Sequence, residues 1–178
     1  MRESLTADGL RHLMRALGEC ATQAARVYFT GGATALLFGW RQTTIDVDLK
    51  IVPEHDALFR ELPRLKDQLS INIELASPDL FIPPVPGWEQ RSRFIAEEGP
   101  LTFLHYDLYS QALAKIERGH ATDVVDVRAM IDSGLVEPDK LQALFEEIVP
   151  VLYRYPALDE GSFRAAVRLA LVDNGTDA

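Results

Sequence analysis

Two aspartates separated by one residue are the most chemically informative pair in this chain. Asp46 and Asp48 lie in the apolar segment Thr44–Leu49. In an extended strand, side chains two residues apart point to the same face, so the two carboxylates are expected side by side. The apolar residues that alternate with them, beginning with Ile45, are expected in the core. Adjacent carboxylates repel each other unless a divalent cation lies between them, and hard oxygen ligands suit Mg²⁺. The pair therefore predicts a metal site.

A pair of glycines upstream, Gly31 and Gly32, predicts a phosphate-binding turn. The residues before them, Val27–Phe29, are typical of a short buried strand, and residues 33–38 are typical of a helix that ends at Gly39. A glycine at a strand-to-helix turn lets a ligand approach the backbone. The free N–H groups and the dipole at the start of the helix favour an anion. A triphosphate would fit this corner.

Together these residues resemble the DNA polymerase β-like nucleotidyltransferase superfamily. Its pattern is a Gly-Gly or Gly-Ser turn, a helix, two acidic residues around one apolar residue on a strand, and a third carboxylate on a later strand. Gly31, Gly32, Asp46 and Asp48 match the first parts in order. Glu74, in the apolar segment 70–75, matches the third carboxylate, although the residues alone leave open that it is a solvent-facing strand residue opposite Ile73 and Leu75.

The chain is also similar to small bacterial nucleotidyltransferases of the abortive-infection toxin type and to a related uncharacterised group. Arg41 precedes the aspartate strand as in those proteins, and Lys115 and Arg118 are followed by Asp123 and Asp126 in the same order. From the residues alone, the two later aspartates are interpreted as structural: they begin a helix after a glycine and pair with Arg118 or Lys115.

The resemblance implies transfer of a nucleoside monophosphate from an NTP to an RNA or protein hydroxyl, with release of pyrophosphate. It implies Mg²⁺, with Mn²⁺ as an alternative, bound by the residues that also serve catalysis: Asp46, Asp48 and Glu74. The nucleotide-binding residues that it implies are Thr30, Gly31, Gly32, Thr34, Arg41 and Lys115. The acceptor would be a tRNA-like RNA or a protein, in a toxin–antitoxin or phage-defence system.

Three other functions are left open. One is a nucleotidyltransferase-fold protein without catalysis that binds a cognate toxin or antitoxin. Another is an antitoxin that adenylylates a protein toxin. The third is a metal-dependent glycosyltransferase, because those enzymes also use an Asp-x-Asp pair, but they usually need a larger nucleotide-sugar domain and lack the Gly-Gly turn.

The pattern of elements predicts an α/β (α+β) fold, with a nucleotidyltransferase-type mixed β-sheet flanked by helices and a C-terminal helical bundle. Residues 1–105 are expected to form the catalytic α/β region, and residues 106–178 a helical region packed on it. Strands are predicted near 27–30, 46–52, 71–75, 92–96 and 101–105. Helices are predicted near 6–24, 33–39, 54–69, 107–118, 122–133, 138–153 and 160–173.

Composition narrows the class of partner. The 178 residues are 47% hydrophobic, and 27 acidic against 18 basic side chains give a net charge of −9. This charge disfavours a broad DNA-binding surface. The single cysteine, Cys20, rules out a disulfide within the chain, and the sequence has no signal-peptide pattern and no membrane-length apolar run. We expect a cytoplasmic protein without membrane partners.

Overall fold

The computed structural model describes residues 4–172, and the chain divides into two compact units. The first unit contains the chain up to Ser77 together with Ser92–Tyr106, and the second contains Pro78–Arg91 together with the chain from Asp107 onward. The first unit is α/β and the second is helical. The α/β class, the mixed sheet and the helical C-terminal part agree with the prediction.

The segment Pro78–Arg91 is grouped with the helical unit, whereas the sequence interpretation divided the chain only once, between residues 105 and 106. Two interactions explain the grouping. The Tyr155 hydroxyl donates a hydrogen bond to the Asp79 carbonyl oxygen over 2.7 Å, and the Arg91 guanidinium lies 2.8 Å from the buried Asp107 carboxylate. Contacts between residues distant in sequence therefore decide to which unit this proline-rich segment belongs.

The first unit is built on one five-stranded mixed sheet. Its strands are β1 (Ala25–Thr30), β2 (Asp46–Val52), β3 (Asn72–Leu75), β4 (Arg93–Glu98) and β5 (Leu101–His105). They lie in the order β3-β2-β1-β5-β4. β1 is antiparallel to β2 and parallel to β5, β2 is parallel to β3, and β4 is antiparallel to β5.

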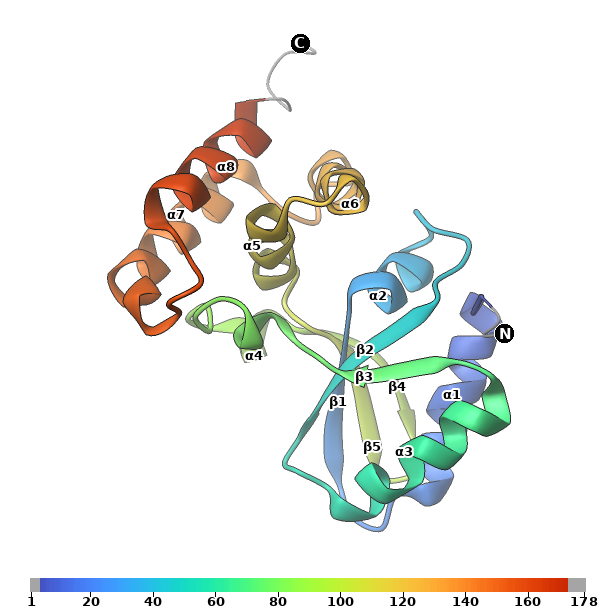
Figure 1. Ribbon diagram of the computed structural model, residues 1–178. Helices are drawn as coiled ribbons and strands as arrows, with labels where there is room; N and C mark the ends of the chain where they lie inside the picture. Colours follow the sequence, from blue (N-terminus) through green and yellow to red (C-terminus); the bar gives the residue numbers. More distant parts are fainter. Residues whose placement is uncertain (1–3, 173–178) are drawn as a thin grey trace. The chain divides into compact units, whose positions relative to one another are not determined.

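Two long helices cover one face of this sheet. α1 (Ala7–Cys20) and α3 (Asp56–Leu69) contact each other and lie on the same side of the strands (Figure 1). Apolar residues at helical spacing make this possible: α1 buries Leu10, Leu13 and Leu17 against alternate strand residues. Each such leucine contributes roughly 1.5–3 kcal/mol of burial free energy. The shorter helix α2 (Gly31–Phe38) directly follows β1.

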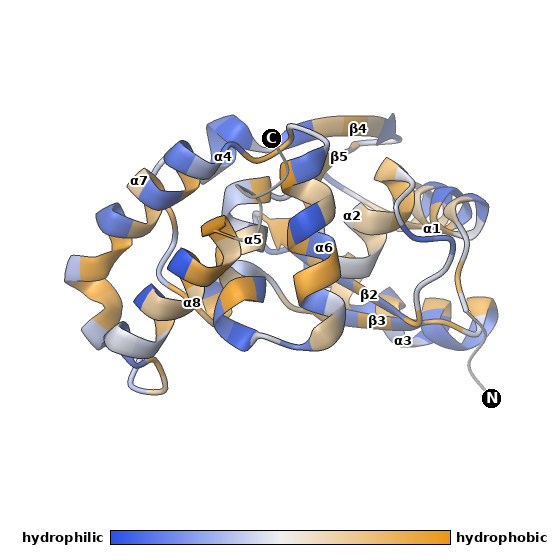
Figure 2. Cartoon of the chain, turned by 90° about the horizontal axis from the view of Figure 1, so that it is seen from above, coloured by the Kyte–Doolittle hydropathy of each residue, from blue (hydrophilic) through white to orange (hydrophobic). Residues whose placement is uncertain are grey.

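The second unit is a group of helices. The longer ones are α5 (Leu108–Arg118), α6 (Ala121–Asp132), α7 (Pro138–Ile148) and α8 (Glu160–Val172), and the short ones are η1 (Pro78–Leu80), α4 (Trp88–Arg91) and η2 (Val149–Arg154). α5 contacts α6, α7 and α8 and buries most of its residues. Hydrophobic and hydrophilic residues are interleaved along α7 and α8, as expected for helices with one packed face and one exposed face (Figure 2).

Two apolar residues expected in the core are exposed instead. Ile45 is 61% exposed and Leu75 is 51% exposed. Ile45 precedes the first residue of β2, so the strand alternation does not extend to it. Leu75 is the last residue of β3, which lies at the edge of the sheet. The helices described between residues 4 and 172 all lack the length and hydrophobicity of a membrane span.

Candidate functional site

The three predicted carboxylates share one face of two neighbouring strands. Along β2, Val47 and Leu49 are buried in the core while Asp46 is exposed and Asp48 is half-buried, so the aspartates face away from α1 and α3. β3 runs parallel to β2, with Asp48 paired to Glu74. Residues paired across strands point to the same face. The structure therefore brings Asp46, Asp48 and Glu74 together.

Asn72 joins two of these carboxylates. It is paired with Asp46 across the strands, and it lies two residues before Glu74 on β3. Its side-chain amide nitrogen donates to Asp46 Oδ1 and to Glu74 Oε1, each over 2.7 Å. The Asn72 side chain is buried, so both of its N–H groups are used inside the fold. The Asn72 amide therefore restrains the positions of the Asp46 and Glu74 carboxylates relative to each other.

The glycine turn lies directly beside Asp48. Gly31 begins α2 with a φ of +57°, a backbone conformation that residues other than glycine rarely adopt. A Cβ added at Gly31 would lie 3.1 Å from Asp48 Oδ2. Thr30 precedes the turn and is paired with Asp48 across β1 and β2, and its side chain makes no capping hydrogen bond to α2. The start of α2 therefore lies at the aspartate strand.

The Thr44 side chain packs against the second glycine of this turn. Its hydroxyl donates to the Asp46 carbonyl oxygen over 3.0 Å, and its backbone is bridged to Leu5. A Cβ at Gly32 would collide with the Thr44 side chain. The second glycine is therefore required by close packing between α2 and the segment that enters β2.

Thr34 and Arg41 occupy different environments. Thr34 is fully buried, and its hydroxyl donates to the Phe29 carbonyl oxygen over 3.3 Å and lies 3.2 Å from His105 Nδ1. Arg41 is partly exposed in the loop after α2, and its backbone N–H donates to the Ala35 carbonyl oxygen. In this geometry the Thr34 hydroxyl supports the fold, whereas the Arg41 side chain reaches the surface.

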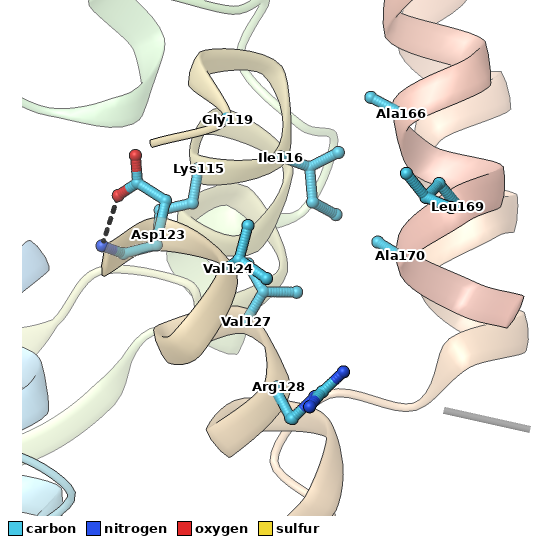
Figure 3. A pocket seen from close by; sticks show the side chains of 10 residues that line it. All are labelled: Lys115, Ile116, Gly119, Asp123, Val124, Val127, Arg128, Ala166, Leu169 and Ala170. Atoms are coloured by element: carbon cyan, nitrogen blue, oxygen red, sulfur yellow. Dashed lines mark hydrogen bonds and ion pairs between the residues drawn. The ribbon is translucent and has the colours of Figure 1, made fainter. Parts of the chain in front are cut away.

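Lys115 belongs to the helical unit, where it is the centre of a buried ion cluster. Its Nζ lies 2.7 Å from Asp126 Oδ2 and 3.3 Å from Asp123 Oδ1, and Arg118 lies 2.6 Å from the same Asp123 oxygen. The pair of Lys115 and Asp123 is drawn in Figure 3. This confirms the interpretation of the two aspartates as structural partners of the basic residues.

The pKa of Asp123 reflects two opposing influences. Burial raises the pKa of its carboxyl group, but the hydrogen bonds and charges of Arg118 and Lys115 outweigh burial, so the pKa is lowered from its usual value. The carboxylate is therefore ionised near neutrality and neutralises the cations around it.

The carboxylates on β2 and β3 supply part of what a divalent cation needs. Among residues 4–172, no group of three or more His, Cys, Asp and Glu side chains is arranged as a complete metal site. Mg²⁺, however, is usually bound by only one or two carboxylates together with substrate phosphates and water. Asp46 and Asp48 beside the helix start supply this donor set, so the residues fit a cation that binds with a phosphate-bearing substrate.

The family comparison agrees with this geometry. A family model described as a nucleotidyltransferase of unknown function (DUF6036) matches residues 9–167. The chain belongs to this nucleotidyltransferase family. Membership confirms the superfamily that the glycine turn and the aspartate pair indicated. Proteins of the nucleotidyltransferase superfamily generally use divalent metals.

Among solved structures, this nucleotidyltransferase family member is similar to an antigenic nucleotidyltransferase-like protein from Paracoccidioides brasiliensis. The identity is 15%, the TM-score is 0.48, and the match covers 93% of this chain and 95% of that one. No match was found among curated proteins.

Two residues of the site were not assigned from the sequence. Asn72 lies two positions before Glu74, and Thr44 lies two positions before Asp46. On β3 this spacing puts Asn72 beside Glu74 on one strand face, whereas Thr44 precedes β2 and its hydroxyl reaches the Asp46 backbone. The spacing was visible in the sequence, but the bridging role of Asn72 depends on how β2 and β3 are paired.

Proposed function

We propose that this protein is a Mg²⁺-dependent nucleotidyltransferase that moves a nucleoside monophosphate from an NTP to a hydroxyl of an RNA or a protein. The supporting observation is the corner formed by Asp46, Asp48 and Glu74 on paired strands, next to the glycine turn that begins α2. Family membership supports the same reaction class.

The glycine turn binds the triphosphate in this proposal. The first N–H groups of a helix have no partner within the helix, and the helix dipole favours negative charge at this end. Because Gly31 and Gly32 carry no side chain, phosphate oxygens can approach these N–H groups closely. Thr30 adds a hydroxyl group beside the turn, and Arg41 supplies positive charge from the loop after α2.

Asp46 and Asp48 hold the cation, and Glu74 completes the set of carboxylates. When bound, Mg²⁺ neutralises charge on the triphosphate and makes the acceptor hydroxyl easier to deprotonate. Mn²⁺ has the same preference for carboxylate and phosphate oxygens and would substitute for it. Asn72 fixes Asp46 and Glu74 through its amide, so the carboxylates are positioned before substrate arrives.

The acceptor oxygen attacks the α-phosphorus and forms a new O–P bond. The bond from the α-phosphorus to the oxygen shared with the β-phosphorus breaks, and pyrophosphate leaves with that electron pair. Glu74 accepts the hydroxyl proton through Oε2, because its Oε1 is already hydrogen-bonded to Asn72. The reaction depends mainly on positioning and on electrostatic stabilisation.

Thr34 and Lys115 have supporting roles in this proposal instead of the nucleotide-binding roles expected from the resemblance. The Thr34 hydroxyl is buried and is used between β1 and β5. The Lys115 ammonium group is held by two buried carboxylates within the helical unit. Both side chains stabilise the elements that carry them.

The test is transfer of label from each α-labelled NTP, with Mg²⁺, in the presence of total RNA or cell lysate. Transfer is expected with the wild-type protein and is expected to be abolished in Asp46→Asn and Asp48→Asn. Asp67→Asn, an exposed charge change on α3, is the matched control and should retain transfer. Full transfer by either active-site variant would refute the proposal. The class of labelled molecule identifies the acceptor.

One observation favours a second candidate, a binding protein without catalysis that pairs with a cognate toxin or antitoxin. The Asn72 amide ties Asp46 to Glu74, so one oxygen of each carboxylate is already hydrogen-bonded within the fold. For such a protein, calorimetry would detect NTP or partner binding while no labelled NTP gave transfer. Transfer that requires Asp46 and Asp48 would exclude this candidate.

A further inference from the structure

A recess lies on the opposite face of the sheet from the carboxylates. Its volume is about 470 Å³, within the size range of small-ligand sites. His105 follows Phe103 by two residues on β5, and Phe103 is in the core beneath α1, so His105 faces α1. The recess is lined by α1, the end of α2, β4 and His105.

One ring nitrogen of His105 contacts a buried hydroxyl group. His105 is buried, with only 6% of the residue exposed, and its Nδ1 lies 3.2 Å from the Thr34 hydroxyl oxygen. When that hydroxyl donates its proton to the Phe29 carbonyl oxygen, 3.3 Å away, it accepts a hydrogen bond from Nδ1–H. The lone pair is then on Nε2, and within the described part of the chain no group donates a hydrogen bond to it.

The ring also stays neutral at physiological pH. Burial, and then the charge of Arg93, lower the pKa of His105 to about 4. Arg93 is paired with His105 across β4 and β5. The Phe38 ring packs against the imidazole with 4.5 Å between ring centroids. His105 therefore presents a rigid, uncharged hydrogen-bond acceptor in the wall of the recess.

The rim of the recess carries positive charge from α1. Arg11 and Arg15 lie one turn apart, and both line the recess. Arg11 is paired with the exposed Asp8. Within residues 4–172, Arg15 is engaged only through Nε, by a long 3.5 Å contact to the Arg11 carbonyl oxygen. Glu98, on β4, is the acidic residue among the lining side chains. The guanidinium of Arg15 therefore keeps donors for an anion.

The remaining wall is apolar. Met14, Leu37 and Ile95 also line the recess. A ligand that matches all three features has an anionic group for the arginines, a flat or apolar body, and an N–H or O–H donor for Nε2. A nucleoside phosphate combines these three properties.

We propose that this recess is a second ligand site that binds a nucleoside monophosphate, with its phosphate on Arg11 and Arg15 and a donor of its base on His105 Nε2. The site lies apart from the carboxylates, so the proposal does not depend on the proposed function.

The experiment is calorimetric titration of adenosine monophosphate in EDTA, into a protein that carries both Asp46→Asn and Asp48→Asn. These conditions remove metal-dependent binding at the carboxylates. Binding is expected to persist, and Arg15→Gln should weaken it by about tenfold or more, the usual effect of losing a charge-assisted hydrogen bond. Arg60→Gln, which removes an exposed charge from α3, should leave the affinity unchanged.

A second measurement reports on His105 without mutating a buried residue. In the two-bond ¹H–¹⁵N NMR spectrum, His105 should show a protonated Nδ1 and a free Nε2, and adenosine monophosphate should shift the Nε2 signal. Adenosine and inorganic phosphate are expected to bind at least about tenfold more weakly than the nucleotide. Equal affinity for inorganic phosphate, an unmoved Nε2 signal, unchanged affinity in Arg15→Gln, or no binding of the nucleotide would each overturn the proposal.

Discussion

Replacing Asp126 by asparagine should destabilise the helical unit measurably. Lys115 Nζ lies 2.7 Å from Asp126 Oδ2, and the two side chains are only 8% and 0% exposed. Removing one partner of a buried ion pair typically costs about 3–5 kcal/mol. Here Asp123 stays 3.3 Å from the ammonium group, but it also neutralises Arg118, so we expect a loss at or just below the lower end of that range, about 2–3 kcal/mol.

Urea unfolding followed by circular dichroism measures this loss. Asp132→Asn is the matched control, because Asp132 is exposed on the same helix, and it should change the free energy of unfolding by less than about 0.5 kcal/mol. The double variant Lys115→Met with Asp126→Leu should recover much of the stability, since it leaves no buried charge unpaired. If Asp126→Asn proves as mild as the control, our reasoning about this cluster is wrong.

Three further predictions concern the glycine turn, the bridging amide and pH. Gly32→Ala should lower the free energy of unfolding by about 1–3 kcal/mol, because its Cβ collides with the Thr44 side chain; a thermal melt as high as that of wild type would contradict this. Asn72→Ala should lower the rate of label transfer by about 10–100-fold while the fold is retained, because Asp46 and Glu74 lose their shared donor; an unchanged rate would exclude a positioning role. The pKa of Asp123 is lower in the folded state, so its contribution to stability is present above its unfolded pKa of about 4 and is lost as pH falls through the folded value. Urea midpoints between neutral and acidic pH should therefore fall less steeply in Arg118→Gln than in wild type, and parallel curves would argue against the assigned cause.

Most helices and strands were predictable because the spacing of apolar residues and the positions of proline and glycine indicate the same boundaries. The strand predicted at 46–52 is β2, and the helix predicted to begin at Pro138 is α7. That helix was expected to continue to residue 153, but it ends at Ile148 and continues as a 3-10 helix. Pro150 explains the difference, because its ring lacks an N–H and clashes with the preceding turn of an α-helix.

The carboxylate face was predictable only in part. Strand alternation puts Asp46 and Asp48 on one face, and it puts Asn72 and Glu74 on one face, whatever the arrangement of the sheet. It does not specify that β3 is parallel to β2 with Asp46 opposite Asn72, because register depends on packing between distant segments. The proximity of the third carboxylate is therefore a property of the sheet.

The recess around His105 could not be predicted from local pattern at all. The sequence around His105 contains no motif that indicates a role for it. Its properties come from Thr34 and Phe38 on α2 and from Arg93 on β4, which only the fold brings to it. The hydrogen bonding and charge of such a residue cannot be predicted locally when the neighbours that determine them are distant in sequence.

The central claim is that Asp46, Asp48 and the glycine turn form the nucleotide and metal site. The most direct test is to measure binding of a non-hydrolysable NTP analogue by calorimetry, with and without Mg²⁺. The account predicts binding that requires Mg²⁺ in wild type and in Asp67→Asn. It predicts loss of that Mg²⁺-dependent binding in Asp46→Asn and in Asp48→Asn, with unchanged thermal stability. Equal Mg²⁺-dependent binding by all four proteins, or none by any of them, would contradict the assignment of this corner as the nucleotide and metal site.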